Sequence, residues 1–216
     1  SGIPDFRSAD GLFFQDLGTT YAPEEIVSHS FFVHHPREFW KYHSTHLLYP
    51  EAQPNKAHLG LAELERRGKV TAVITQNIDG LHQKAGSRNV LELHGTVWRN
   101  YCVDCGQRFD MAYVLASEDM PECSTCGGIV RPDVVLYEEG LDPQVMDESI
   151  EQLSAADTLI VGGTSLAVYP AAGLIRAFRG RNLVLINKEP TPADRLASLV
   201  IHAPIGETLG GVVLGH

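Results

Sequence analysis

The chain has 216 residues, of which 44% are hydrophobic, and its formal net charge is −10. This length predicts one large domain or one domain with a small insert, and no stretch approaches the ~18 consecutive apolar residues of a membrane span. The acidic balance disfavours a general nucleic-acid binder, which would carry a basic surface, but it leaves open a cationic peptide as partner.

The chain begins in a glycine- and proline-rich stretch, "SGIPDFRSADGLF", which predicts a loop over residues 1–12. It has no initiator Met and no signal-like charged and apolar regions. We expect further residues before Ser1 in the parent protein. Phe6 and Arg7 in this loop could cover a ligand and contact a phosphate, although the same loop is also compatible with an ordinary surface role.

Helices and short strands alternate over residues 36–97. One helix is expected across Pro36–Leu48, and a second begins after the N-cap residue Asn55 and ends before Gly68. The apolar runs at 70–74 and 91–93 predict buried strands. The apolar face of the second helix is expected to consist of Ala57, Leu61 and Leu64.

Residues 98–133 are rich in Cys, Gly and Asp and are expected to be an insert. Beyond them, a helix should begin at Asp142-Pro143 and present Met146, Ile150 and Leu153 on one face. Strands are expected at 134–139, 158–163, 182–187 and 198–204, with a helix at 171–178. Short apolar strands that alternate with helices predict an α/β fold with a parallel sheet covered by helices on both faces.

The four cysteines form one pattern, and it is the strongest motif in the chain. Cys102 and Cys105 are separated by two residues, as are Cys123 and Cys126, and 17 residues lie between the two pairs. This spacing is typical of a four-thiolate zinc ribbon, whose closed coordination makes the ion structural. Two disulfides or free buried thiols are the alternatives. A zinc ribbon alone could also belong to a nucleic-acid module, which the acidic charge and the surrounding α/β pattern disfavour.

A second motif, Gly162-Gly163-Thr164-Ser165, follows a predicted strand and precedes a helix. Glycines allow backbone N–H groups to approach a phosphate, and hydroxyl groups add donors. The next strand ends at Asn187, with Glu189 two residues later. Their separation in sequence from the Gly-Gly turn is near the ~20 residues at which nucleotide-binding sheets place a residue that contacts the ribose. An ordinary tight turn between strand and helix is the alternative, since the full dinucleotide fingerprint is absent.

Polar side chains follow two other predicted strands where these strands end. Gln76, Asn77 and Asp79 follow one strand, and His94 follows the next. Open α/β sheets bind ligands at the carboxyl ends of their strands, so these residues are candidates for a binding site. A polar turn with Asp79-Gly80 at its corner is the alternative, and a lone histidine among ten is usually not catalytic.

Taken together, these segments resemble the sirtuins, which are NAD-dependent protein-lysine deacylases with a Rossmann-like fold. The resemblance covers essentially the whole chain in the family's order. It rests on "SGIPDFR" at 1–7, "PNKAH" at 54–58, "TQNIDGLH" at 75–82, "LHG" at 93–95, the four cysteines, "RPDVVLYEE" at 131–139, "GGTS" at 162–165 and "LIN" at 185–187.

The resemblance implies specific roles. His94 would be the general base acting on the nicotinamide ribose, a step suited to a histidine near neutral pH. The other implied site residues are Asn77, Ile78 and Asp79 around the nicotinamide, Gln76 at the ribose, Phe6 over the reacting sugar carbon, Arg7 near the phosphates, Gly163, Thr164 and Ser165 at the phosphate and adenosine, and Asn187, Lys188 and Glu189 at the adenosine ribose. The substrate peptide would pair with Val134, Val135, Leu136 and Tyr137.

Two departures from the sirtuin pattern have consequences. The family's glycine-rich "GAGIS"-type segment, which precedes the position of Ser1, is absent, so we expect these residues by themselves to be a poor enzyme. Tyr137-Glu138-Glu139 stands where the family usually has Phe-Gly-Glu, which puts a charge at the peptide-binding edge.

The acyl preference is predicted from the helix before "PNKAH". Sirtuins that prefer succinyl- or malonyl-lysine carry a Tyr and an Arg there, and the matching positions are Trp40 and His43. A mostly neutral imidazole makes no bidentate contact with a carboxylate. We therefore expect a deacetylase that tolerates longer apolar acyl groups and has weak desuccinylase activity.

The resemblance also implies a domain division and partners. The NAD-binding, Rossmann-like domain would consist of residues 1–12, 55–97 and 134–216, while 13–54 and 98–133 would form the helical and zinc-ribbon modules of a small domain. NAD would be a co-substrate, with one structural Zn²⁺ per chain. We expect a cytoplasmic monomer that acts on acyl-lysine proteins, without membrane or sequence-specific nucleic-acid binding. Protein ADP-ribosylation and a non-catalytic role as NAD sensor or zinc-ribbon adaptor are the alternatives.

Overall fold

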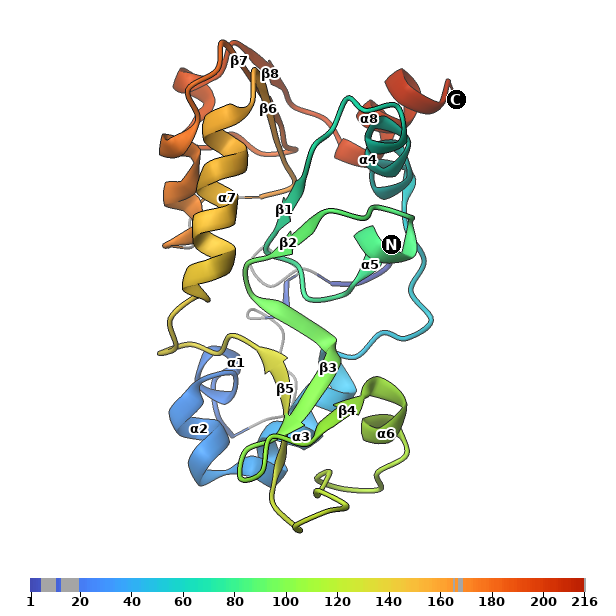
Figure 1. Ribbon diagram of the computed structural model, residues 1–216, viewed down its shortest axis with the longest axis vertical. Helices are drawn as coiled ribbons and strands as arrows, with labels where there is room; N and C mark the ends of the chain where they lie inside the picture. Colours follow the sequence, from blue (N-terminus) through green and yellow to red (C-terminus); the bar gives the residue numbers. More distant parts are fainter. Residues whose placement is uncertain (5–10, 13–19, 165, 167–168, 216) are drawn as a thin grey trace. The chain divides into compact units, whose positions relative to one another are not determined.

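The computed structural model describes residues 1–4, 11–12, 20–164, 166 and 169–215 (Figure 1). The chain forms two compact units, and each has a hydrophobic core of its own. The first unit contains Ser1–Ala52, Asn77–Gly80 and His94–Gly140, and the second contains Gln53–Gln76, Leu81–Leu93 and Leu141–His216. Each unit is a part of the chain whose residues contact one another more than they contact the rest. The functional domain ranges given above are defined differently and remain a prediction.

The first unit contains an antiparallel sheet in the order β4-β3-β5 (Figure 1). Its strands are β3 (Gly95–Cys102), β4 (Arg108–Asp110) and β5 (Val130–Val134), and its helices are α1 (Pro23–Ile26), α2 (His29–His34), α3 (Pro36–His46) and α6 (Met111–Leu115). Aromatic residues of α2 and α3 pack with Val97 of β3 in one core cluster. The indole N–H of Trp40 donates to the carbonyl of Val130, 2.9 Å away, which ties α3 to β5.

His43 lies in this core without a hydrogen-bond partner. Its side chain is 2% exposed, it stacks on Phe39 at 5.4 Å between ring centroids, and both ring nitrogens are unpaired within the described part of the chain. Burial disfavours the imidazolium and lowers the pKa of His43 from 6.5 to about 3. This residue therefore makes the fold sensitive to acid.

We expect His43→Leu to flatten the loss of stability in mild acid. Because the folded-state pKa lies below the unfolded one, the unfolded chain binds the proton first, and stability is lost as the pH falls from 6.5 towards 3. Between pH 7.5 and pH 5 this linkage amounts to about 2 kcal/mol. Urea unfolding at the two pH values measures it, with the exposed His34→Leu as control. A variant that keeps the wild-type acid sensitivity would contradict this prediction.

The second unit contains two parallel sheets (Figure 1). One pairs β1 (Val73–Thr75) with β2 (Val90–Glu92), and the other has the order β6-β7-β8, formed by Thr158–Gly162, Asn182–Ile186 and Leu199–Ile201. The accompanying elements are α4 (Lys56–Arg66), α5 (Leu81–Lys84), α7 (Pro143–Ala155), α8 (Ile205–Leu214) and the 3₁₀ segments η2 (Ala171–Ala177) and η3 (Asp194–Leu196). The α/β class with parallel strands is confirmed, although the described parallel strands form two sheets and not one.

Helix ends in this unit follow the predicted signals. The Asn55 side chain accepts from the backbone N–H groups of Ala57 and His58 at the start of α4, and the His58 ring accepts from the Asn55 backbone in return. Burial lowers the pKa of His58 to about 4, which keeps the ring neutral and able to accept this bond. Gly68 has φ +67° just beyond the helix, and Asp142 caps α7, so both predicted helix starts are confirmed.

Three local predictions are wrong. The strand expected at 134–139 lies earlier, at Val130–Val134, because Glu138 adopts a left-handed backbone with φ +77° that ends extended pairing. Ile150 is 41% exposed, since the buried stripe of α7 runs through Ser149 and Leu153. The segment at 171–178 forms a 3₁₀ helix instead of an α-helix.

Every helix in the described ranges is too short or too polar to cross a membrane.

Candidate functional site

The strands that precede the candidate catalytic residues pair in parallel. Thr75 of β1 lies opposite Glu92 of β2, and the Leu93 N–H donates to the Thr75 carbonyl at 2.9 Å. The chain then continues into Gln76 and Asn77 after one strand and into His94 after the other. Parallel strands direct their carboxyl ends to the same edge of a sheet, so both polar segments start from one edge.

Segment Asn77–Gly80 is fastened to the start of β3 in the first unit. The carbonyl of Ile78 accepts from the Val97 N–H at 3.0 Å and from the Thr96 hydroxyl at 3.3 Å. The indole N–H of Trp98 donates to the Asp79 carbonyl at 2.7 Å. These three donors lie within four residues of His94 in the chain, so the amide–carboxylate segment is attached to the part of β3 that follows the histidine.

The indole of Trp98 also explains Gly80. This glycine has φ +70°, and a Cβ at its position would lie 2.7 Å from the indole ring. Only glycine allows the turn after Asp79 to lie flat against Trp98.

His94 is held by its neighbours on both sides. Its carbonyl accepts from the Val135 N–H at 3.0 Å, immediately after β5 ends. The next residue, Gly95, has φ +72°, and a Cβ there would lie 2.0 Å from the Asp133 carbonyl oxygen. A side chain at residue 95 would therefore push β3 away from β5. The half-buried His94 side chain thus projects from a backbone that has little freedom to move.

The Gly-Gly-Thr turn lies in the second unit and meets Gln76. Gly163 has φ +61° and donates its N–H to Ile186 of β7 at 3.1 Å. The Thr164 hydroxyl accepts from the Leu166 N–H at 3.1 Å and from the Gln76 side chain at 3.5 Å. Two predicted NAD contacts, Gln76 and Thr164, are therefore neighbours in space although they are 88 residues apart in sequence.

Asn187 shapes the turn after β7. Its side-chain amide donates to the Glu189 carbonyl at 2.7 Å, and its backbone N–H donates to Ile201 of β8 at 3.1 Å. Lys188 and Glu189 are exposed. Because β6 and β7 are parallel neighbours, Gly163 and Asn187 follow strands that end at the same sheet edge.

The four cysteines converge at one point of the first unit. Their sulfur atoms all lie within 4.8 Å of one another, and Sγ–Sγ is 3.5 Å between Cys102 and Cys126 and 3.6 Å between Cys105 and Cys123. A disulfide would require about 2.05 Å, so the two-disulfide alternative does not fit. Thiolates around a zinc ion at about 2.3 Å lie about 3.8 Å apart in a tetrahedron, which these distances approach.

Each pair of cysteines forms the same turn. Gly106 and Gly127 follow the second cysteine of each pair, and both have a left-handed φ, +74° and +75°. Each donates its N–H back to the first cysteine of the pair, at 3.0 Å to Cys102 and 2.9 Å to Cys123. Two matched turns that direct four sulfurs to one point fit a zinc ribbon.

The predicted peptide-binding residues lie at and beyond the end of β5. Val134 pairs with Gly95 in the sheet, and Val135 bonds to His94. Tyr137 forms a parallel bridge with the residue before α2, donating its N–H to Val27 and accepting from His29. The backbone of this segment is thus already shaped by the protein itself.

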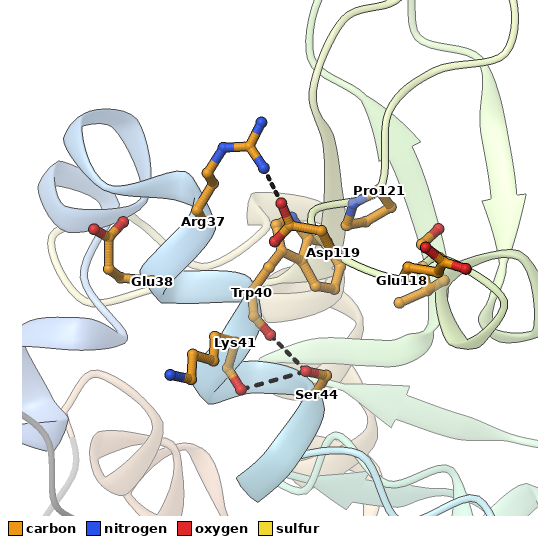
Figure 2. Close-up of a pocket in the computed structure, with 10 residues that line it drawn as sticks. Arg37, Glu38, Trp40, Lys41, Ser44, Glu118, Asp119 and Pro121 are labelled. Carbon is orange, nitrogen blue, oxygen red and sulfur yellow. Dashed lines mark hydrogen bonds and ion pairs between the residues drawn. The ribbon is translucent and has the colours of Figure 1, made fainter.

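Trp40 and His43 belong to the hydrophobic core, where each is 2% exposed. Trp40 lines a cavity of about 480 Å³ between α3 and residues 114–121, and Figure 2 shows the residues that surround it. The cavity is also lined by charged residues, among which Arg37 pairs with Asp119. The acyl pocket of Trp40 and His43 remains a prediction. The packing does not favour it, because both side chains are buried in contact with other core residues.

Sequence reasoning missed the residues that fix the site, namely Thr96, Val97 and Trp98. The available signal was the run of β-branched and aromatic residues directly after His94-Gly95, which favours a strand. Three predicted site residues, Phe6, Arg7 and Ser165, lie outside the described residues.

Comparison with known proteins gives close relatives over nearly the whole length. The chain is 60% identical over 214 residues to the NAD-dependent protein deacetylase of Clostridium perfringens (strain 13 / Type A), which covers 99% of this chain and 88% of that protein. It is 55% identical over 212 residues to the NAD-dependent protein deacetylase of Cutibacterium acnes (strain DSM 16379 / KPA171202), with 98% and 86% covered.

Solved structures agree with these relatives. The fold is similar to a crystal structure of a Sir2 homolog–NAD complex, with a TM-score of 0.88 and 38% identity over 100% of this chain and 83% of that chain. It is also similar to Sir2 bound to acetylated peptide, with a TM-score of 0.81 and 38% identity over 88% and 83%. Residues 1–170 match the Sir2 family. From the convergent site, the shared architecture and this match, we conclude that the chain belongs to the Sir2 family.

Proposed function

We propose that this chain is an NAD-dependent protein-lysine deacetylase that releases nicotinamide and forms an O-acyl-ADP-ribose. The observation that carries the proposal is the joint anchoring of segment Asn77–Gly80 and His94 at the start of β3. The amide of Asn77, the carboxylate of Asp79 and the imidazole of His94 would then act on the same sugar, the nicotinamide ribose of NAD. The identity to proteins named as NAD-dependent protein deacetylases supports this reading.

In this reaction NAD is a substrate bound by turns at strand ends. The Gln76 amide and Thr164 hydroxyl, which contact each other, would meet the ribose and phosphate portion. The positive φ of Gly163 lets the backbone approach a phosphate closely. The proposed NAD-binding residues are Phe6, Arg7, Gln76, Asn77, Ile78, Asp79, Gly163, Thr164, Ser165, Asn187, Lys188 and Glu189.

The chemistry follows from the position of His94. The acyl oxygen of the substrate lysine would attack the ribose carbon as nicotinamide leaves into the pocket of Asn77 and Asp79. His94 would then accept the proton of a ribose hydroxyl, so that the sugar oxygen attacks the acyl-imidate carbon. Addition of water to that carbon and departure of the lysine amine would complete the reaction, with the acyl group left on the ribose. The rigid backbone at Gly95 would hold the imidazole at the required distance.

A structural Zn²⁺ fits the four cysteines. Cys102, Cys105, Cys123 and Cys126 would supply all four ligands, and the ion would hold the two turns of the ribbon together without taking part in the reaction. The proposed protein partner is an acyl-lysine peptide along Val134–Tyr137, next to His94.

The decisive assay measures nicotinamide release from NAD with an acetyl-lysine peptide, with the same peptide carrying unmodified lysine as control. We expect release only with the acetylated peptide, together with one O-acetyl-ADP-ribose per nicotinamide by mass spectrometry. ADP-ribose attached to protein would instead favour the transferase alternative. Absence of turnover with NAD still bound would favour the non-catalytic sensor.

A further inference from the structure

Glu138 occupies a backbone conformation that a residue with a side chain rarely adopts. Its φ is +77°, and it is one of two non-glycine residues with positive φ in the described part of the chain. Such a conformation is disfavoured sterically for L-residues and persists where surrounding contacts compensate. The contacts of the Glu138 side chain therefore have to offset this steric cost.

The Glu138 carboxylate is bound by Ser30 at the start of α2. One oxygen, Oε2, accepts from the Ser30 N–H at 2.9 Å and from the Ser30 hydroxyl at 2.6 Å. These hydrogen bonds lower the pKa of Glu138 below its usual value. A carboxylate that accepts from a backbone N–H at the beginning of a helix forms a strong, charge-assisted interaction.

Glu139 holds the same turn from the other side. Its carboxylate accepts two hydrogen bonds from Arg131, at 2.7 and 3.0 Å, and one from the Leu136 N–H at 2.8 Å. Burial favours its protonated form, but these bonds outweigh burial and lower the pKa of Glu139 to about 2. The His29 ring lies 2.8 Å from the same carboxylate.

Two neighbouring carboxylates thus fasten the turn after Tyr137, one to Ser30 and one to Arg131. The first residue of this segment, Val135, donates its N–H to the carbonyl of His94. Residues 135–138 are therefore fixed at one end to the proposed catalytic residue and at the other to α2. A peptide that lies along this segment would take its position from both fixed ends.

We propose that Glu138 is a positioning residue for the acyl-lysine peptide, because its bonds to Ser30 hold residues 135–138 in the conformation that the peptide contacts. This inference rests on the proposed function. The turn stays left-handed because Ser30 binds the Glu138 carboxylate. Loss of these hydrogen bonds would let residues 135–138 change conformation, while the zinc ribbon and the ends of β1 and β2 would stay unchanged. The effect should therefore fall on peptide binding and spare NAD.

The test compares Glu138→Ala, Ser30→Ala and Ser30→Thr with the wild type. Glu138→Ala removes the carboxylate and keeps the Cβ that disfavours the left-handed backbone, Ser30→Ala removes the hydroxyl donor, and Ser30→Thr keeps that donor. We expect Kd for a fluorescent acetyl-lysine peptide to rise about tenfold in Glu138→Ala, the change expected when a charge-assisted interaction is lost. Ser30→Ala should show a smaller rise, and Ser30→Thr should restore wild-type binding.

Steady-state kinetics separate positioning from a general structural effect. We expect KM for the peptide to rise while kcat and KM for NAD stay within about twofold of wild type. The exposed Glu25→Gln serves as control for loss of one negative charge. Unchanged peptide Kd in Glu138→Ala, or a joint change of kcat and both KM values, would overturn the inference. Because peptide Kd is measured without turnover, this result is independent of the nicotinamide assay that tests the proposed function.

Discussion

Replacing His94 by alanine is expected to reduce deacetylation by at least about 100-fold, the lower range for removal of a general base. The alanine variant retains the Gly95 turn and the backbone carbonyl that accepts from Val135. Fold and zinc content should therefore stay near those of the wild type. Initial rates of O-acetyl-ADP-ribose formation under saturating NAD and acetyl-lysine peptide measure the loss.

His34→Ala is the matched control, because His34 is an exposed histidine of α2 in the same compact unit. It should keep wild-type rates. If His94→Ala turned over both substrates at the normal rate with an unchanged melting temperature, His94 would not be the general base. If His94→Ala lost activity and its melting temperature also fell markedly below that of the wild type, His94 would have a structural role instead.

Removal of zinc is expected to unfold the ribbon formed by the two cysteine pairs. The zinc ion would hold together four cysteine side chains whose sulfur atoms lie within 4.8 Å of one another, and closed zinc sites supply folding free energy directly. We expect one zinc per chain by elemental analysis. Chelation should lower the melting temperature by at least about 10 °C, as loss of several kcal/mol does in a chain of this size.

Cys126→Ser and Ser124→Ala form a matched pair for this experiment. Both residues are exposed in the same turn, but only Cys126 directs a sulfur towards the cluster. The serine variant should lose zinc and protease resistance around residues 98–133, whereas Ser124→Ala should keep both. Protein purified without zinc, with four thiols that titrate freely and an unchanged melting temperature, would contradict the zinc site.

Several elements could be predicted because their signals are local. Asn55 and Asp142 cap their helices through side chains that bond to backbone groups two or three residues away, and Gly68 ends a helix for the same short-range reason. The paired cysteine turns need only a two-residue spacing and a following glycine. The end of β1 at Thr75, where Gln76 and Asn77 follow, was visible from the change in composition alone.

Other features depend on partners that are distant in sequence. Residues 134–139 have strand composition, yet Glu138 turns away because Ser30, 108 residues earlier, binds its carboxylate. His43 could have been an exposed ligand-binding histidine, but the aromatic packing of α3 buries it. Fixing Ile78 to the first part of β3 required the Val97 backbone and the Thr96 hydroxyl. Propensity and spacing act over a few residues, whereas burial and long-range hydrogen bonds are settled only when each unit folds. The sequence could therefore predict site residues, but the geometry that holds them depended on the tertiary structure.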